Sequence, residues 1–135
     1  MSTEFQFRLV TPRQAVVDQT VLEVTAPGTV GEFGVLPDHA NFLSSLESGR
    51  LSFKDNRGVK AYAVRGGFAE VVDNVMTVLT EAAEAAAEID PTRARADLQS
   101  AEAEVAKLSP IDPAYEAADE RRRWAQAQLE VSAAK

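Results

Sequence analysis

The sequence of 135 residues has no cysteine, a single histidine and no glycine after Gly67. Without cysteine the chain can form neither disulfides nor thiolate metal sites, and one histidine excludes a histidine-rich metal centre. No apolar run approaches the roughly 20 residues that span a bilayer, and the N-terminus lacks the basic start and apolar core of a signal peptide. We therefore expect a soluble, intracellular protein without a metal site.

Basic residues are also fewer than acidic residues. Lys and Arg number 14 against 21 Asp and Glu, which gives a formal net charge of −7. Phosphate backbones repel such a chain, so we expect no nucleic-acid partner. Hydrophobic residues make up 45% of the sequence, which is enough to build a packed core.

The composition changes near residue 80. All seven glycines lie between Gly28 and Gly67, whereas Ala, Glu and Arg dominate from Glu81 onward. Glycine supplies turns between strands, and Ala, Glu and Arg favour helix. The change predicts an α+β protein, mainly β, in which residues 1–85 form an antiparallel β-sandwich and residues 86–135 form an antiparallel two-helix hairpin.

Short alternating segments fill the first part of the chain. Phe5, Phe7 and Leu9 alternate with polar residues, as in a half-buried strand that ends at Thr11-Pro12. Further strands are predicted over 20–26, 51–54, 60–64, 68–72 and 75–79, with turns at 27–28, 55–58 and 73–74. Many short strands separated by turn residues favour a sandwich or a flattened barrel.

Two helix start signals follow. Ile89-Asp90-Pro91 and Ile111-Asp112-Pro113 each place Asp as the N-cap and Pro at the first helical position. Leu108-Ser109-Pro110 ends the first helix. The signals predict helices over 91–108 and 113–131, which must be antiparallel neighbours because their connection is short.

The predicted seam between these helices is rich in alanine. The first helix contributes Ala94, Leu98, Ala101, Val105 and Leu108, and the second contributes Ala114, Ala117, Trp124 and Val131, with Arg121 and Gln128 in the same stripe. A buried methyl contributes about 0.8 kcal/mol, against roughly 1.5 to 3 kcal/mol for a leucine. The composition predicts a weakly held hairpin, and it leaves a movable hairpin and a permanently docked one equally open.

Few residues suggest catalysis, and we expect a non-enzymatic protein. His39 adjoins Asp38, but neighbours on a turn rarely face one another, so a loop-ordering or partner-contact role is favoured over a general base. Glu32 is interpreted as a surface contact or a turn residue. The densest positive cluster is Arg121, Arg122 and Arg123, which is either a solvated face neutralised by nearby acids or an anion clamp for phosphate or acidic partner residues.

Three motifs together suggest a family. They are GEFGVLPDHA at residues 31–40, VRGGFAEV at 64–71 followed by Asn74 and by TVL at 77–79, and IDPTRA at 89–94. In order, spacing and two-part layout they closely resemble the epsilon subunit of bacterial F-type ATP synthases over essentially the entire chain. The match rests on the combination, since no single motif is decisive.

The resemblance implies a non-catalytic central-stalk (rotor) subunit of a proton-translocating ATP synthase, peripheral at the cytoplasmic face of the bacterial inner membrane. It implies a sandwich that links the gamma subunit to the proteolipid ring, with Glu32 and His39 as ring contacts. It also implies a hairpin that lies folded on the sandwich or extends toward the alpha and beta catalytic subunits, where it inhibits ATP hydrolysis. Arg121, Arg122 and Arg123 are then candidates for contact with the catalytic head.

The resemblance also implies a regulatory ATP site that includes Ile89, Asp90, Arg93 and Ala94. The residues themselves favour weak or absent binding. Asp90 is already needed as an N-cap, and Pro91 donates no N–H to a phosphate. Residues 99 and 100 are Gln and Ser, where nucleotide-responsive relatives tend to carry another basic residue. We expect no required cofactor, and ATP at most as a weak regulatory ligand.

Two other classes of protein remain open. A free-standing β-sandwich binding module with a helical dimerisation tail predicts a stable homodimer and an aromatic-lined pocket. An enzyme, which we rank last, predicts activity that is lost on His39→Ala. A rotor subunit predicts a mainly monomeric chain that co-purifies with a gamma partner.

Overall fold

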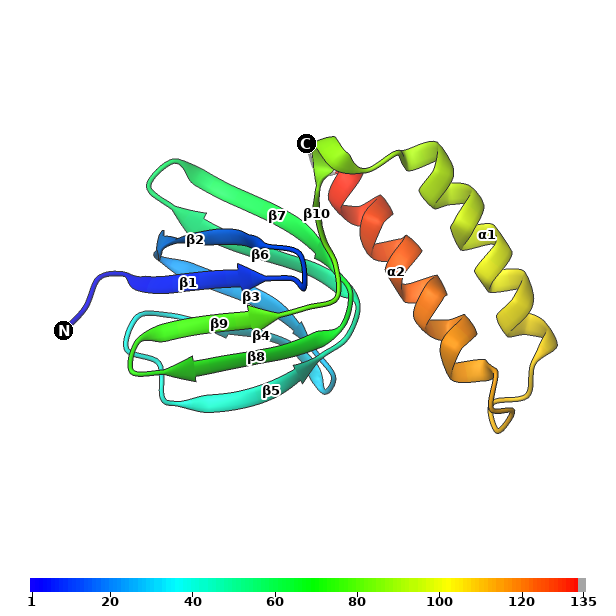
Figure 1. Cartoon of the computed structure of the whole chain (residues 1–135), viewed down its shortest axis with the longest axis horizontal. Helices are drawn as coiled ribbons and strands as arrows, with labels where there is room; N and C mark the ends of the chain where they lie inside the picture. Colours follow the sequence, from blue (N-terminus) through cyan, green and yellow to red (C-terminus); the bar gives the residue numbers. More distant parts are fainter. Residues whose placement is uncertain (134–135) are drawn as a thin grey trace.

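The computed structural model describes residues 1–133 and shows a β-sandwich followed by two helices (Figure 1). The strands are β1 Phe5–Val10, β2 Ala15–Val21, β3 Glu23–Gly28, β4 Gly31–Val35, β5 Phe42–Leu46, β6 Gly49–Asp55, β7 Gly58–Val64, β8 Gly67–Val72, β9 Val75–Leu79 and β10 Ala83–Ala85. The short helix η1 Ala86–Glu88 leads into α1 Pro91–Lys107 and α2 Tyr115–Ala133. This confirms the predicted fold class.

The strands follow the order β10-β7-β6-β3-β5-β8-β9-β1-β2, and β4 pairs with β3. Neighbouring strands are antiparallel apart from β1 and β9, which run parallel in the described part of the chain. Parallel pairing needs a long connection, and here the connection is the rest of the sandwich. The N-terminal strand is therefore inserted between β9 and β2.

The period-two pattern places one side of each strand in a common core. Phe7, Leu9, Phe53, Met76 and Val78 are almost completely buried. The rings of Phe7 and Phe53 pack with their centroids 5.4 Å apart. A filled interior of this kind makes the sandwich a stiff block.

Two of the three predicted turns are confirmed. Residues 56–57 join β6 to β7, and Asp73 and Asn74 join β8 to β9 with φ angles of 47° and 65°. Asp and Asn tolerate this left-handed conformation better than other non-glycine residues.

The strand predicted over 20–26 is partly correct, because these residues belong to the end of β2 and to β3, and the turn predicted at Pro27-Gly28 is wrong. The chain breaks at Leu22, whose N–H donates to the Lys54 carbonyl at 2.7 Å, and β3 continues through Gly28. The turn lies at residues 29–30 instead. Gly28 serves close packing, because a Cβ there would lie 2.7 Å from the Gly31 carbonyl oxygen. Strands β4, β5 and β10, and residues 15–19 of β2, were also not predicted.

The start of α1 matches the prediction. Asp90 Oδ1 accepts from the N–H groups of Thr92 and Arg93 at 3.0 and 3.3 Å, and Pro91 is the first helical residue. α1 ends at Lys107, one residue before the predicted end. α2 starts two residues later than predicted, because Asp112 closes a turn in which its carboxylate accepts from the Ala114 N–H at 2.9 Å.

α2 lies between the sandwich and α1 (Figure 1). A cluster of buried apolar residues, here called the docking cluster, joins β7, the start of α1 and α2, and it contains Ala63, Ile89, Ala94, Ala127 and Val131. No helix within residues 1–133 has the length and apolar character needed to cross a membrane.

The predicted seam is only partly correct. Ala94 and Ala101 are buried as expected, but Ala114 and Ala117 are exposed, and Ala118 and Ala125 are buried in their place. The reason is that α2 covers two surfaces, α1 on one side and β6 and β7 on the other, so its buried face is wider than one stripe.

Candidate functional site

A cleft of about 490 Å³ opens where α1 and α2 meet the segment that leaves the sandwich. Cavities of this size accommodate small molecules. One wall is the IDPTRA motif. Its charged lining consists of the acidic residues Glu84, Glu88, Asp90 and Asp97 and the basic residues Arg65, Arg93 and Arg121.

The four residues predicted for a nucleotide site all line this cleft, but they have different structural tasks. Ile89 and Ala94 are 8% and 2% exposed and belong to the docking cluster of the hairpin. Asp90 caps α1. Arg93 is exposed, and within residues 1–133 no carboxylate pairs with it. Arg93 is therefore the member of the motif whose charge is available to a ligand.

The other two arginines of the cleft are already paired. Arg65 binds Glu120 with a shortest N–O distance of 2.8 Å, and Arg121 pairs with Glu104 of α1. The hydrogen bonds that Arg65 donates to the Glu120 carboxylate raise the pKa of Arg65. Burial by itself would raise the pKa of Glu120, but hydrogen bonds from Arg65 and Ser48 lower it. The cleft thus offers one unpaired cation among four acidic residues, which is a poor environment for a triphosphate.

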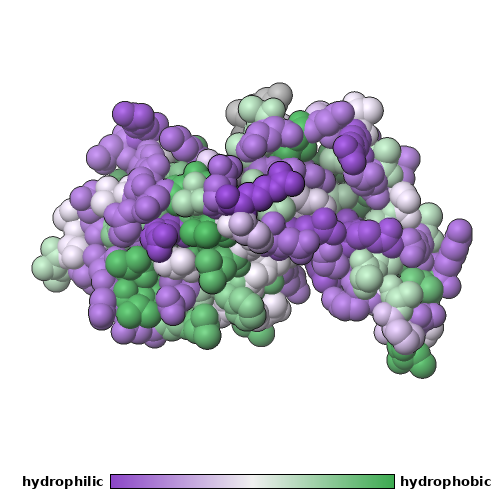
Figure 2. Space-filling view, viewed as in Figure 1, coloured by the Kyte–Doolittle hydropathy of each residue, from purple (hydrophilic) through white to green (hydrophobic). Residues whose placement is uncertain are grey.

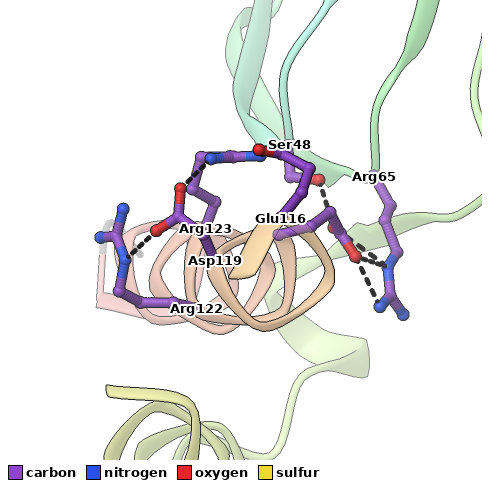
Figure 3. Close-up of polar contacts among 7 residues, drawn as sticks. Ser48, Arg65, Glu116, Asp119, Arg122 and Arg123 are labelled. Carbon is purple, nitrogen blue, oxygen red and sulfur yellow. Dashed lines mark hydrogen bonds and ion pairs between the residues drawn. The ribbon is translucent and has the colours of Figure 1, made fainter. Parts of the chain in front are cut away.

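Arg65 and Glu120 also connect the sandwich to the hairpin, and Figure 3 shows Arg65 and Ser48 on the sandwich side of this contact. Arg65 follows β7, Ser48 lies between β5 and β6, and Glu120 is on α2. Ser48 Oγ donates to Glu120 Oε2 at 2.8 Å, and the Arg65 guanidinium lies 5.6 Å from the centroid of the Trp124 ring. This contact was not predicted, and the one sequence signal that pointed to Arg65 is its place in the VRGGFAEV motif.

The arginine cluster of α2 is neutralised by acidic neighbours in the folded arrangement. Arg122 pairs with Asp119, and Arg123 pairs with both Asp119 and Glu116 (Figure 3). Burial tends to lower the pKa of Arg123, but these carboxylates raise it. This is the arrangement that the solvated-face interpretation requires. Contact with a catalytic head stays a prediction.

Glu32 and His39 are both exposed. Glu32 lies in β4 opposite Pro27, and His39 lies in the loop after that strand. The His39 and Phe42 rings are 5.0 Å apart, and Phe42 meets Phe33 edge-on at 5.4 Å. A short aromatic row therefore joins the neighbourhoods of the two residues, and their contact with a proteolipid ring stays a prediction.

The outer face of β5, β8 and β9 is unusually apolar. Leu43, Phe68 and Leu79 are 70%, 56% and 53% exposed, and Val72 and Val75 are also exposed. Phe68 pairs with Leu79, so their side chains project side by side. Figure 2 shows hydrophobic residues gathered over this part of the sandwich. Exposed patches of this kind mark sites of protein association.

Sequence comparisons agree with these features. Residues 4–86 match the family model described as ATP synthase, Delta/Epsilon chain, beta-sandwich domain. An ATP synthase epsilon chain of Geobacter sulfurreducens is 47% identical over 124 residues, which cover 90% of each chain. One from Desulfatibacillum aliphaticivorans is 48% identical over 103 residues, which cover 76% of this chain and 73% of the relative.

Solved structures share the fold. A chain in the structure of Euglena gracilis mitochondrial ATP synthase with OSCP, F1 and c-ring matches with a TM-score of 0.83 and 24% identity, over 98% of this chain and 83% of that chain. A chain in the central stalk and c-ring of Tetrahymena thermophila mitochondrial ATP synthase matches with a TM-score of 0.64 and 17% identity, over 94% and 95%. Given the motifs, the fold and the curated relatives, the chain belongs to the family of ATP synthase epsilon chains.

Proposed function

We propose that the chain is a non-catalytic central-stalk subunit of a proton-translocating ATP synthase, held peripherally at the cytoplasmic face of the membrane. In this proposal residues 1–85 dock on the rotor and residues 86–135 regulate it. The observation that carries the proposal is the apolar outer face of a sandwich whose interior is already filled. A stiff block with one exposed apolar face is suited to permanent docking.

The gamma subunit is the proposed occupant of that face. Leu43, Phe68 and Leu79 present side chains that water solvates poorly, and their burial is favourable by about 25 cal/mol per Å². The proteolipid ring is the proposed partner of Glu32 and His39, since exposed polar side chains suit contact with polar loops. The subunit then connects the two parts of the rotor.

The hairpin is the proposed regulatory element. Its docking cluster contains three alanines, so the apolar contribution to docking is small. An element held this weakly can exchange between a folded position and an extended position beside the alpha and beta subunits, where it inhibits hydrolysis. Shifting such an equilibrium from 1:99 to 99:1 takes about 5.5 kcal/mol of differential contact.

ATP binding at the cleft is proposed to be weak or absent, because Arg93 is its one unpaired cation among the described residues. Isothermal titration of the chain with Mg-ATP tests this. The expected result is no saturable heat below millimolar concentration, and a sub-millimolar signal that Arg93→Ala abolishes would contradict it.

Affinity purification of the tagged chain from solubilised membranes tests the main proposal. Recovery of the gamma subunit, the proteolipid ring and the catalytic head is expected. Recovery of a homodimer without these partners would favour the alternative of a free-standing binding module.

A further inference from the structure

Ser48 and Arg65 of the sandwich both contact Glu120 of α2, and Arg65 forms an ion pair with it. Nε and Nη2 of Arg65 donate to the carboxylate of Glu120 with distances of 2.8 to 3.3 Å, and Ser48 Oγ donates to the same carboxylate. The Arg65 and Glu120 side chains are only 29% and 33% exposed. A two-point, charge-assisted contact is stronger than a single hydrogen bond and also fixes the orientation of its partners.

The remainder of this interface is modest. Its apolar part includes the buried residues Ala63, Ala127 and Val131 and the partly buried Trp124 and Leu129. Among the described residues, a further polar contact joins Gln128 to Glu84 of β10 at 2.7 Å. Arg65 touches α2 a second time through the Trp124 ring. Arg65 therefore holds α2 through an ion pair and through a cation–π contact.

Hydrogen bonds within the sandwich hold the backbone of Arg65 in position. The Arg65 N–H donates to Thr80 Oγ1 at 3.0 Å and to the Ala82 carbonyl at 2.9 Å, which fixes the backbone on which the side chain stands. On the other side, the pair between Arg121 and Glu104 lies within the hairpin. Departure of α2 from the sandwich breaks the Arg65 contact and leaves the hairpin pair intact.

We propose that Ser48, Arg65 and Glu120 form a latch that sets the equilibrium between a docked hairpin and a hairpin released as one unit. The proposal deepens the regulatory role given above and rests on it for its biological meaning. The latch itself is a property of the isolated chain. When Glu120 loses its charge, Arg65 is left partly buried and unpaired, so the docked state loses more than one hydrogen bond.

Thiol labelling can measure this equilibrium. The chain has no cysteine of its own, so only a cysteine introduced by substitution reacts. Ala127→Cys places one thiol in the interface at a position that is 2% exposed, so it reacts when the hairpin leaves. In this background Glu120→Gln should accelerate labelling about tenfold or more, which corresponds to about 1.4 kcal/mol. The matched control Glu104→Gln removes a carboxylate from an ion pair inside the hairpin and should change the rate less than about twofold.

A second thiol separates hairpin release from unfolding. Ala69→Cys places it in the sandwich core at a position with 0% exposure, and Glu120→Gln should leave its labelling rate unchanged. Arg65→Gln should act like Glu120→Gln at position 127, and the double variant should be no faster than the faster single variant.

Three results would overturn the latch: no acceleration at position 127, equal acceleration at positions 127 and 69, or additive effects of the two substitutions. Hydrolysis by the assembled complex is measured separately. The two experiments test different statements. Thiol labelling of the isolated chain tests the latch alone, and ATP hydrolysis by the assembled complex tests the inhibitory role of the hairpin alone.

Discussion

Phe68→Ala should weaken binding of the chain to the gamma subunit about tenfold. Phe68 is 56% exposed on the apolar outer face and pairs with Leu79. Complete burial of a phenylalanine contributes roughly 1.5 to 3 kcal/mol. A little over half of that remains available to a partner, so removal of the ring should cost about 1 to 1.5 kcal/mol of binding free energy, which is roughly tenfold in Kd.

Titration of the chain into a catalytic head that contains gamma and lacks this subunit measures the effect. Val59→Ala is the matched control, because Val59 is 63% exposed but lies on β7 in the other layer of the sandwich. Urea unfolding should show that the stability of the isolated Phe68→Ala chain falls by less than about 1 kcal/mol. If Phe68→Ala binds within twofold of the unmodified chain, or Val59→Ala is the weaker binder, the apolar face is not the gamma surface.

Three further predictions concern the hairpin and the turns. A chain truncated after Glu88 should still assemble and support coupled synthesis, while ATP hydrolysis by the complex rises; unchanged hydrolysis would remove the inhibitory role. The pKa of Glu120 is lowered by its hydrogen bonds, so its contribution to docking should be complete above its ordinary value of 4.5 and should fade as the pH falls through the lowered pKa. In the thiol assay, the difference between Ala127→Cys with and without Glu120→Gln should therefore disappear in acid, and a difference that persists there would contradict the assignment. Gly67→Ala should cost about 2 kcal/mol or more in urea unfolding, because a Cβ there would overlap a carbonyl oxygen of β9, whereas Gly31→Ala, also at positive φ but with open space around it, should cost about 1 kcal/mol; equal costs would refute the steric argument.

Much of the fold was predictable because its determinants are local. Phe5, Phe7 and Leu9 alternate with polar neighbours, and Asp90 precedes Pro91, so a strand and a helix start follow from the residues themselves. β4 was missed because most of its residues are exposed and it shows no clean alternation. The buried residues of α2 were predicted incorrectly because α2 packs against the sandwich as well as against α1, and the contact with the sandwich could not be read from the sequence.

The candidate site was only half predictable for the same reason. The IDPTRA motif is continuous, so its position in the cleft could be anticipated. The contact of Arg65 with Glu120 joins residues 55 positions apart, and nothing near either residue in the sequence indicates the other. The availability of a charged side chain to a ligand also depends on its ion-pair partner. From the sequence alone Arg65 and Arg121 are candidates to bind an anion, but in the structure a carboxylate already pairs with each of them.

The parallel pairing of β1 with β9 has a consequence for synthesis on the ribosome. Gln6 pairs with Val75, so β1 leaves the exit tunnel well before the strand that pairs with one of its two edges, β9, has been made. Closing a loop of about seventy residues costs chain entropy before any contact compensates for it. Nascent chains that stall before residue 79 should expose Phe5, Phe7 and Leu9 to chaperones, whereas the hairpin, made of local contacts, can form within its own length as soon as it emerges.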